Sequence, residues 1–585
     1  MRVRMILPAL TEATSPHFRP IKYSLFPPLG LATLAAYLDP ADDVVISDEH
    51  VEKLRFDDEP DVVVIQVYIT SARRAYEIAD GYRSRGAYVC LGGLHVTSLP
   101  EEAAEHADTI FLGPGEDTWP RFLADYRARS PQPRYESRQR TLAGLPRIRR
   151  DLIKRHLYLV PNSIVVSRGC PHVCDFCYKV AFFKGGKQFY TQTVDDALAE
   201  IDRLPGRHLY FLDDHLFGNP KFAASLFDGM RGVGRLWQAA GTVKSVLESP
   251  QLLEKAVASG LRSLFVGFET VNAANLAGQR KYQNIGRDYD AAVRRLHGLG
   301  VMVNGSFVFG MDDDGPDVFD RTVEWAINQG IETATFHILT PYPDTALHAR
   351  LAGEGRILHS DWDLYDTRRV VFRPAGMDAE TLESGYWRAY RDFYRWGSIW
   401  AGASTKETLR GRMRHLAYAA GWKKFEPAWN LAIRSKQVVH ALPLLEAILT
   451  GFGRHRPQRN APPNEPFVVR PTTTARLPVA LGPESDHSEY SADLGRRPED
   501  VVNGAGSGLV PEQGRGVGDA GAGVDQQAGS EGGVDEVADA GRTGDVDGVL
   551  GTVAGLADDG QCVVSVVGLQ VQAAREPPGI EIALE

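Results

Sequence analysis

Short, continuously apolar runs alternate with amphipathic segments along much of this 585-residue chain, and this rhythm constrains its fold most strongly. Within residues 1–128 the runs lack the alternation of a strand with one face in water, so each predicted strand is covered on both faces. Strand and helix alternating in this way predict an α/β fold with a doubly wound parallel sheet. The predicted strands are Val3–Leu7, Val44–Ile46, Val62–Val67, Tyr88–Leu91 and Thr109–Leu112.

Two glycine-rich loops follow the last two of these strands. In a parallel sheet, ligands bind beyond the carboxyl ends of the strands, where these loops lie. Glycine lets the backbone approach a ligand closely, but it also suits a simple tight turn, and both interpretations stay open. The loops are Gly92-Gly93-Leu94-His95 and Gly113-Pro114-Gly115-Glu116.

The same rhythm returns after a stretch rich in Arg, Pro, Ser and Gln at residues 129–155, which we interpret as a linker. Six further βα units predict a partial barrel of parallel strands over residues 156–375, with its chemistry at the carboxyl ends. Residues 376–455 are predicted to form a helical cap, and residues 456–585, dominated by Gly, Val, Asp and Ala, to be disordered. The predicted barrel strands are Ile164–Ser167, Leu209–Leu212, Ala239–Val246, Ser263–Phe268, Met302–Phe309 and Ala334–Thr340.

The bulk properties exclude several classes of protein. The formal net charge of −10 gives no reason to expect a nucleic acid partner. No apolar run reaches the roughly 20 residues that span a bilayer, which predicts no transmembrane segment. The N-terminus becomes polar too early for a signal peptide, so we expect a cytoplasmic protein. Five cysteines in a chain of this length do not indicate a disulfide framework.

Three of those cysteines lie within eight residues and indicate a metal centre. Cys170, Cys174 and Cys177 have the spacing C-x3-C-x2-C directly after a predicted strand. So compact a loop can place three thiolates around a [4Fe–4S] cluster and leave the fourth iron open to a small molecule. The alternative is a zinc site completed by His172, but zinc sites more often use paired C-x2-C units, and the chain has no second pair.

This cysteine loop and the six βα units resemble the radical SAM superfamily over about residues 156–375. The resemblance implies that the three cysteines ligate the cluster, that S-adenosylmethionine (SAM) binds the open iron, and that reductive cleavage of SAM starts radical chemistry. Among further residues, it implies that Phe176 packs near the adenine, that Asp213 and Asp214 replace a Gly-Gly-Glu motif at the SAM amino group, and that Glu269 and Ser306 contact SAM. Alternatively, the aspartates cap a helix and Glu269 belongs to a structural ion pair.

The N-terminal region is similar to the cobalamin-binding domain that precedes the barrel in a subgroup of these enzymes, the class B methyltransferases. The order of its loops and their junction to the cysteine loop support this resemblance. It implies that Gly92, Gly93, His95, Gly113, Gly115 and Glu116 contact cobalamin. The Asp-x-His-x-x-Gly signature that supplies a histidine to cobalt is absent, because Asp48-Glu49-His50 lacks both the spacing and the glycine.

Taken together, the resemblances imply cobalamin-dependent methyl transfer to an unactivated carbon of a specialised metabolite or lipid. They also imply an external electron donor of the flavodoxin or ferredoxin type. A radical SAM oxidoreductase or cyclase that uses no cobalamin is the rival enzyme, and a non-catalytic sensor of cobalamin or of the cluster is the rival from another class. Residues that act directly in catalysis are not identified. The segment Thr340-Pro341-Tyr342-Pro343-Asp344-Thr345 follows the sixth barrel strand, and either it lines the substrate pocket or its prolines only stiffen a turn.

Overall fold

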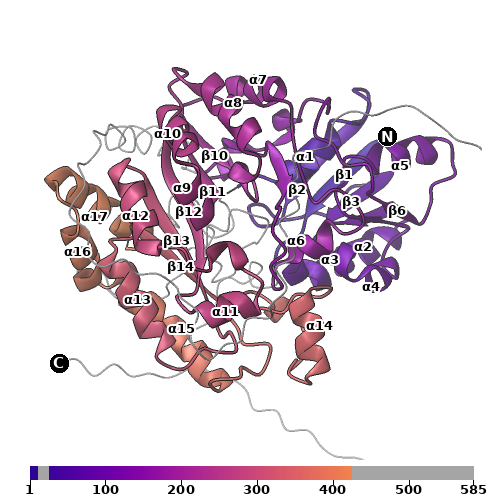
Figure 1. Ribbon diagram of the computed structural model, residues 1–585. Helices are drawn as coiled ribbons and strands as arrows, with labels where there is room; N and C mark the ends of the chain where they lie inside the picture. The colour runs from indigo at the N-terminus through magenta and orange to yellow at the C-terminus, as the bar shows by residue number, and fades with distance from the viewer. Residues whose placement is uncertain (11–25, 425–585) are drawn as a thin grey trace, which may run out of the picture. The chain divides into compact units, whose positions relative to one another are not determined.

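The computed structural model describes residues 1–10 and 26–424 of the chain (Figure 1). The predicted disordered segment 456–585 and the last part of the predicted cap lie outside these residues. Within them, no helix is both long and apolar enough to cross a membrane.

The first domain is a six-stranded, fully parallel sheet with the strand order β2-β1-β3-β4-β5-β6. Neighbouring residues of β3 enter different cores: Val62 and Val64 pack in one hydrophobic cluster, whereas Val63 and Ile65 pack in another. Both faces of the sheet are therefore covered, as the continuously apolar runs predict. Its elements are β1 (Arg2–Leu7), α1 (Leu29–Ala35), β2 (Asp43–Asp48), β3 (Val62–Gln66), η3 (Ile69–Ser71), α2 (Ala72–Arg83), β4 (Tyr88–Gly92), α3 (Leu94–Ser98), α4 (Pro100–Ala104), β5 (Thr109–Leu112), α5 (Trp119–Arg127) and β6 (Arg134–Glu136).

The range interpreted as a linker contains more structure than its composition suggests. Strand β6 extends the first sheet, because Tyr135 is buried and stacks on Phe111 with ring centroids 5.5 Å apart. Farther along, the buried Arg140 guanidinium donates hydrogen bonds to the carbonyl oxygens of Ser137 and Lys184. Two 3-10 helices, η4 (Arg150–Leu152) and η5 (Arg155–Leu157), then lead into the second sheet.

The second sheet is the predicted partial barrel, with six parallel strands in the order β14-β13-β12-β11-β10-β7. The strands are neighbours in the order of the chain, as right-handed βα units require. Its elements are β7 (Ser163–Ile164), α7 (Val194–Arg203), β10 (His208–Phe211), η6 (Leu216–Gly218), α8 (Pro220–Met230), β11 (Leu236–Gly241), α9 (Val243–Glu248), α10 (Pro250–Ala258), β12 (Leu261–Glu269), α11 (Ala273–Gly278), η7 (Tyr282–Asn284), α12 (Tyr289–Gly298), β13 (Met302–Phe309), α13 (Val318–Asn328), β14 (Thr333–Ile338) and α14 (Ala346–Gly353).

Two predicted barrel strands are wrong in their extent. The predicted strand Ala239–Val246 ends at Gly241, because Thr242 and Ser245 form a capping box that starts helix α9. The predicted strand Ile164–Ser167 is divided: Ile164 ends β7, whereas Ser167 begins a separate ribbon.

Three helices follow the barrel as the described part of the predicted cap: α15 (Ala379–Tyr394), α16 (Trp396–Ser404) and α17 (Leu409–Lys423). Figure 1 shows them on the side of β13 and β14. Tyrosine hydroxyls on α15 fix this packing, since Tyr390 bonds to the backbone of Phe336 and Tyr394 to that of Ala334. The 3-10 helix η8 (Trp362–Leu364) lies between α14 and this cap in sequence.

Candidate functional site

The cysteine loop begins after β8 (Ser167–Gly169) and ends at the short helix α6 (Tyr178–Phe182). Strand β8 pairs with β9 (Phe189–Thr191) in a two-stranded antiparallel ribbon. Gly169 opens the loop with φ of 79°, and a Cβ there would overlap the carbonyl oxygen of Gln188. Only glycine fits this position without moving the backbone.

Two aspartates after β10 hold the start of the loop. Asp213 is fully buried and accepts hydrogen bonds from the Val166 amide at 3.1 Å and the Ser167 hydroxyl at 2.6 Å. Asp214 accepts the Gly169 amide at 2.8 Å and lies 3.5 Å from the Lys179 ammonium. Burial, opposed in part by these hydrogen bonds, raises the pKa of Asp213 to about 7.

The middle of the loop is held by its backbone at Asp175. Its amide donates to the carbonyl oxygen of Gln279 at 3.1 Å, and its own carbonyl oxygen accepts the Leu347 amide at 3.1 Å. The Asp175 carboxylate also pairs with Arg280 at 3.2 Å. The segment between Cys174 and Cys177 is therefore fixed against α11 and the first turn of α14.

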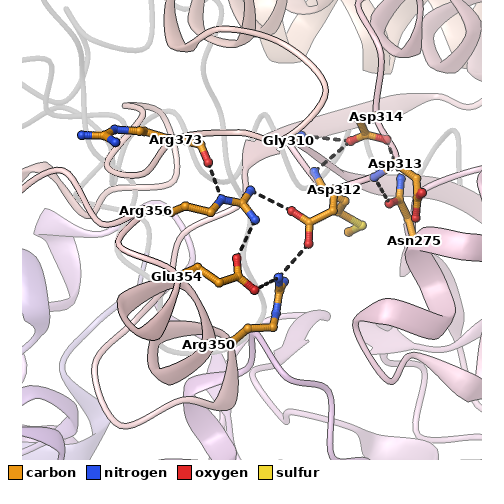
Figure 2. Close-up of polar contacts among 10 residues, drawn as sticks. Asn275, Gly310, Asp312, Asp313, Asp314, Arg350, Glu354, Arg356 and Arg373 are labelled. Carbon is orange, nitrogen blue, oxygen red and sulfur yellow. Dashed lines mark hydrogen bonds and ion pairs between the residues drawn. The ribbon is translucent and has the colours of Figure 1, made fainter.

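Helix α14 is itself held by a network of charged side chains (Figure 2). Asp312, in the loop after β13, accepts from Arg350 of α14 at 2.7 Å and from Arg356 at 2.8 Å, and Glu354 pairs with both arginines. Next to it, Asp314 accepts hydrogen bonds from the Gly310 amide and the Asn275 side chain. The loop after β13 thus connects to the two helices that hold Asp175.

A cavity of about 210 Å³ lies at the carboxyl ends of the barrel strands and brings most of the predicted residues together. All three cysteines line it, with Phe176, Asp214, Glu269 and Ser306. Asp213 does not, because it lies behind the loop that it holds. The other lining residues are His172, Tyr178, Lys179, His215, Ala240, Gly241, Thr242, Phe265, Gly267, Lys281, Gln283, Val308, His337, Ile338, Leu339, Thr340, Tyr342 and Thr367.

Glu269 forms a buried ion pair with Lys281 at 2.5 Å. The register of β12 against β13 shifts between Gly267 and Glu269, and Glu269 has a positive φ of 64°. A Cβ on Gly267 would overlap the Glu269 carboxylate, so that glycine leaves room for the pair. Although burial opposes it, the Glu269 charge raises the pKa of Lys281. Glu269 thus forms the ion pair that was the alternative interpretation, and it also lines the cavity in which contact with SAM is predicted.

The cysteine thiols lie in a partly desolvated, cationic environment. Burial raises the pKa of Cys170 to about 11, while the Lys179 charge opposes that rise. Burial also raises the pKa of Cys174, against the charge of Lys281. The Cys174 sulfur accepts a contact from the Gln283 amide at 3.6 Å. The buried ammonium of Lys281 and the half-buried ammonium of Lys179, beside the sulfurs, suit a centre whose thiolates are all deprotonated.

The described residues do not gather three or more His, Cys, Asp or Glu side chains around a point that could hold a single metal ion. A cubane cluster differs from zinc in this respect, because its three protein sulfurs bind three separate iron atoms. The arrangement of the loop therefore gives no support to the Cys3His zinc alternative, although His172 also lines the cavity.

Three histidines face the same cavity in their neutral form. Burial lowers the pKa of His172 to about 4, that of His215 to about 3 and that of His337 to about 4. His337 points its Nδ1 at the Thr367 hydroxyl at 3.2 Å. At neutral pH these rings add hydrogen-bonding groups and no charge.

In the first domain, the loop after β4 is built on a glycine that no other residue can replace without strain. Gly93 has φ of 122°, and a Cβ there would lie 2.6 Å from the Val67 carbonyl oxygen and 3.0 Å from its nitrogen. The Val67 amide donates to the Gly92 carbonyl oxygen at 2.8 Å, so the two loops meet backbone to backbone. The structure therefore shows a tight turn at Gly93. That the loop also contacts a ligand stays a prediction.

His95 lies in α3, directly after this loop, and is buried. Its Nε2 lies 2.8 Å from Glu102, which also accepts the Tyr76 hydroxyl at 3.0 Å and the Trp362 indole N–H at 3.2 Å. The hydrogen bond from His95 is the main cause of a lowered pKa of Glu102. The other ring nitrogen of His95, Nδ1, has no hydrogen-bond partner among the described residues.

The loop after β5 meets the barrel. Gly113 has φ of 76°, and a Cβ on it would lie 3.2 Å from the Ser137 side chain. A Cβ on Gly115 would lie 3.0 Å from Leu34. Glu116 is buried and pairs with Arg168 of β8 at 2.6 Å. The predicted cobalamin residue Glu116 therefore supports the strand that leads to the cysteines.

His50 belongs to the segment that most resembles the Asp-x-His-x-x-Gly signature, which the chain lacks, and its side chain is turned inward. Its Nδ1 lies 2.8 Å from Asp48, which also accepts the Tyr158 hydroxyl at 3.0 Å. Both side chains are buried.

A second, smaller cavity of about 30 Å³ lies against the loops of the first domain. His95 and Tyr68 line it from that domain, and Tyr178 and Tyr342 line both this cavity and the larger one. The remaining lining residues are Ile69, Thr70, Leu94, Ser98, Pro343, Tyr365 and Asp366.

Several residues of the site escaped sequence analysis. Lys179 and Lys281 carry no spacing signal, because each pairs with an acidic residue from a different element of the fold. Tyr178 follows the last cysteine directly but resembles any aromatic residue in a helix. Trp362 contacts Glu102 across 260 residues of sequence.

Comparison with known proteins gives a family match in the first domain and relatives that cover about 60% of the chain. Residues 23–123 match the B12 binding domain family. The bacteriochlorophyllide d C-12(1)-methyltransferase of Chlorobaculum tepidum is 30% identical over 352 residues, which cover 58% of this chain and 76% of that protein. The hopanoid C-2 methylase of Rhodopseudomonas palustris is 26% identical, over 62% of this chain and 72% of that protein.

A solved structure supports the fold. The cobalamin-dependent SAM radical enzyme OxsB, determined with aqua-cobalamin bound, matches with a TM-score of 0.51 and 13% identity over 75% of each chain. The B12 binding domain matches, and the likeness to the bacteriochlorophyllide methyltransferase covers 76% of that protein. The chain therefore belongs to the family of radical SAM methyltransferases that carry an N-terminal cobalamin-binding domain.

Proposed function

We propose that this protein transfers a methyl group to an unactivated carbon of a mainly apolar, ring-containing small molecule or lipid. One observation carries the proposal: the cavity that collects the three cysteines adjoins a second cavity under the loops of the B12-binding domain, and the two share Tyr178 and Tyr342. A methyl donor and a radical initiator acting on one carbon need such neighbouring sites.

Cys170, Cys174 and Cys177 are the residues we assign to the [4Fe–4S] cluster. The donor set fits this group, because three thiols line one cavity beside Lys179 and Lys281 and leave space for a further ligand. When bound, the cluster passes one electron to the sulfonium of SAM, and cobalamin carries the methyl group. The electron would come from an external carrier of the flavodoxin or ferredoxin type.

We assign SAM to the same cavity, where Asp214, Glu269 and Ser306 supply oxygen atoms and Phe176 an aromatic face. A carboxylate held in a desolvated cavity attracts the cationic amino group of SAM strongly. Glu269 is preorganised for this contact by Lys281, and Asp214 by Lys179 and the Gly169 amide. Asp213 holds the loop in place and is not part of this assignment.

Cobalamin is assigned to the carboxyl edge of the first sheet. The fit rests on the backbone cradle at Gly93, which a Cβ would fill, and on the unpartnered Nδ1 of the buried His95 beside the smaller cavity. A ring nitrogen without a partner suits the amide side chains of cobalamin, which can both donate and accept. Gly92, Gly113 and Gly115 shape the adjoining loops, whereas Glu116 acts through Arg168.

The substrate class follows from the lining and from the relatives. Apolar side chains such as Phe265, Val308 and Leu339 line the larger cavity between its polar groups. The two named relatives act on a bacteriochlorophyllide and on a hopanoid, which both present large apolar ring systems. Methylation of such a carbon requires removal of a hydrogen that no acid or base of a protein can abstract.

The test uses full-length protein reconstituted anaerobically with iron, sulfide and hydroxocobalamin, then desalted. We expect about four irons and one cobalt per chain. With SAM and a strong reductant, the protein should form 5′-deoxyadenosine, and SAM labelled with CD3 should deliver label to cobalt. Iron without cobalt would contradict the methyl-transfer part, and no iron would contradict the whole proposal.

A matched pair of variants locates the cluster. Cys174→Ala removes one of the three assigned thiolates, and we expect loss of the cluster absorption and at least a hundredfold loss of 5′-deoxyadenosine formation. Cys90→Ala makes the same chemical change at a buried cysteine in β4, far from the cavity in sequence, and should keep both. Equal behaviour of the two variants would refute the assignment.

A further inference from the structure

The cysteine loop and the segment that contains η7 form a thin wall between the larger cavity and the outside of the barrel. Along both of them, neighbouring residues face opposite sides of this wall. Cys174 lines the cavity and is buried, whereas Val173 directly before it is 47% exposed. Lys281 and Gln283 line the cavity, whereas Tyr282 between them is 59% exposed. Cys174, which we assign to the cluster, therefore lies directly beneath the outer surface.

The two exposed side chains, Val173 and Tyr282, belong to one surface. The Gln283 side-chain amide contacts the Cys174 sulfur at 3.6 Å, so the residues next to the exposed pair touch each other. Exposed apolar side chains that adjoin one another indicate an interaction site. Aromatic residues are also enriched in protein–protein interfaces.

Positive charges surround this pair. Arg280, with 56% of its side chain exposed, pairs with Asp175 of the cysteine loop at 3.2 Å. Helix α9 contacts η7 and carries Lys244, whose side chain is 47% exposed. Glu248 of the same helix pairs with Lys244 at 3.8 Å and with Arg287 at 2.5 Å. The surface thus carries three cations against two carboxylates, on a chain whose formal net charge is −10.

The proposed function needs an external carrier that passes one electron to the cluster for each SAM molecule cleaved. Electron transfer slows steeply with distance, so a carrier works best where the cluster lies nearest to the surface. Complexes that transfer electrons bury small interfaces, and complementary charges speed their encounter. The thin wall at Cys174 meets the first requirement, and the exposed pair with its cations meets the second.

We propose that Val173, Lys244, Arg280 and Tyr282 form the docking face for a flavodoxin-type electron carrier. Such a carrier is a small acidic protein whose flavin exposes an apolar edge, which complements an apolar pair among cations. One electron leaves the reduced flavin and enters the cluster, with no bond formed or broken. The inference rests on the proposed function, which assigns the cluster to the cysteines, and it goes beyond that function by naming the surface and the partner.

The test uses purified flavodoxin and full-length protein with its cluster reconstituted. Titration calorimetry gives the dissociation constant of oxidised flavodoxin and needs no turnover, and the loss of cluster absorption gives the rate of reduction by reduced flavodoxin. Tyr282→Glu and Lys244→Glu each place a negative charge on the docking face, and each should weaken binding and slow reduction by about fivefold or more. Dithionite is a small reductant that needs no docking face, so its reduction of the cluster should stay within about twofold of wild type in both variants.

Two matched controls change residues of similar exposure elsewhere on the protein. Trp400→Glu replaces an aromatic side chain on α16 that is 58% exposed. Arg321→Glu reverses the charge of an exposed i,i+4 pair on α13, as Lys244→Glu does on α9. Both controls should bind flavodoxin and be reduced by it as the wild-type protein is. Added salt should weaken binding to the wild-type protein more than binding to Lys244→Glu, because salt screens the attraction.

Unchanged binding and reduction in Tyr282→Glu and Lys244→Glu would overturn the inference, as would equal losses in the controls. A loss with dithionite that equals the loss with flavodoxin would also overturn it. If one variant does not assemble its cluster, the other decides. Reduction of the wild-type cluster by a ferredoxin but not by flavodoxin would overturn the choice of partner. A wild-type protein that holds no cluster, or forms no 5′-deoxyadenosine with dithionite, would instead refute the proposed function.

Discussion

Replacing Gly93 by alanine should separate ligand binding from folding in the first domain. The backbone at Gly93, with φ of 122° and ψ of −168°, lies in a region that is essentially open to glycine alone, where another residue costs about 1–3 kcal/mol. The new Cβ would also lie 2.6 Å from the Val67 carbonyl oxygen, which the loop can avoid only by moving away. That movement weakens the hydrogen bonds joining Val67 to Gly92 and His95, each worth about 1 kcal/mol.

With both bonds lost the sum is about 3–5 kcal/mol, and it is concentrated at the loop that we assign to cobalamin. If binding requires the native loop, this cost is subtracted from the binding free energy, and about 2.7 kcal/mol of it raises the dissociation constant for hydroxocobalamin a hundredfold. Gly86→Ala is the matched control: Gly86 also has a positive φ, of 86°, but nothing lies within 4 Å of its Cβ position, and it precedes β4 rather than following it. We expect Gly86→Ala to lower the melting temperature slightly and to leave the hydroxocobalamin constant within twofold of wild type. Wild-type affinity in Gly93→Ala, or equal loss in both variants, would refute the reasoning.

Three further predictions concern the barrel. Gly267→Ala places a methyl group against Glu269 and Lys281. It should weaken SAM binding about tenfold, measured by equilibrium dialysis, without changing hydroxocobalamin binding. Gly278→Ala, with open space around its Cβ, should change the binding of neither ligand. Lys406→Met leaves the buried carboxylate of Glu332 without the ammonium 2.8 Å away, and should cost about 3–5 kcal/mol in hydrogen-exchange protection of β14, while Lys255→Met at an exposed pair should cost less than about 1 kcal/mol. The melting temperature should fall as the pH drops from 7 to 4. Burial lowers the pKa of His297, and the Lys406 charge, against burial, holds the pKa of Glu332 well below its usual range. Both groups therefore stabilise the fold above their unfolded pKa values and lose that contribution on acidification. His297→Gln should flatten the upper part of this decline, and an unchanged profile in that variant would count against the assignment.

The elements that sequence analysis predicts well are those with a strong local signal. Buried parallel strands such as β3 and β13 are continuous apolar runs, and the C-x3-C-x2-C spacing is visible without any structure. The predicted strand Ala239–Val246 is too long because β-branched residues outweighed a weak Thr-x-x-Ser cap, which the structure shows to be decisive. The edge strand β6 escaped because its one buried residue, Tyr135, depends on packing against Phe111.

The side chains of the site were harder to predict than the elements, for a physical reason. Asp213 and Asp214 are neighbours with similar sequence signals, yet one holds the ribbon behind the cavity and the other faces into it, because successive residues after a strand point in opposite directions. Pairs such as Lys281 with Glu269 need the fold to bring them together.

The contacts between the two domains explain why both must be docked for the proposed chemistry. Glu116, from the loop after β5, pairs with Arg168 one residue before Gly169 opens the cysteine loop. Trp362, from the barrel side, donates to the same Glu102 that orients His95. Each domain therefore supplies a buried or partly buried polar group that supports, in the other domain, a loop or residue that we assign to a ligand. A charged partner left unpaired in such a place is costly, so separating the domains would disturb both assigned sites at once. We therefore expect the proposed methyl transfer to depend on both of these contacts rather than on either loop alone.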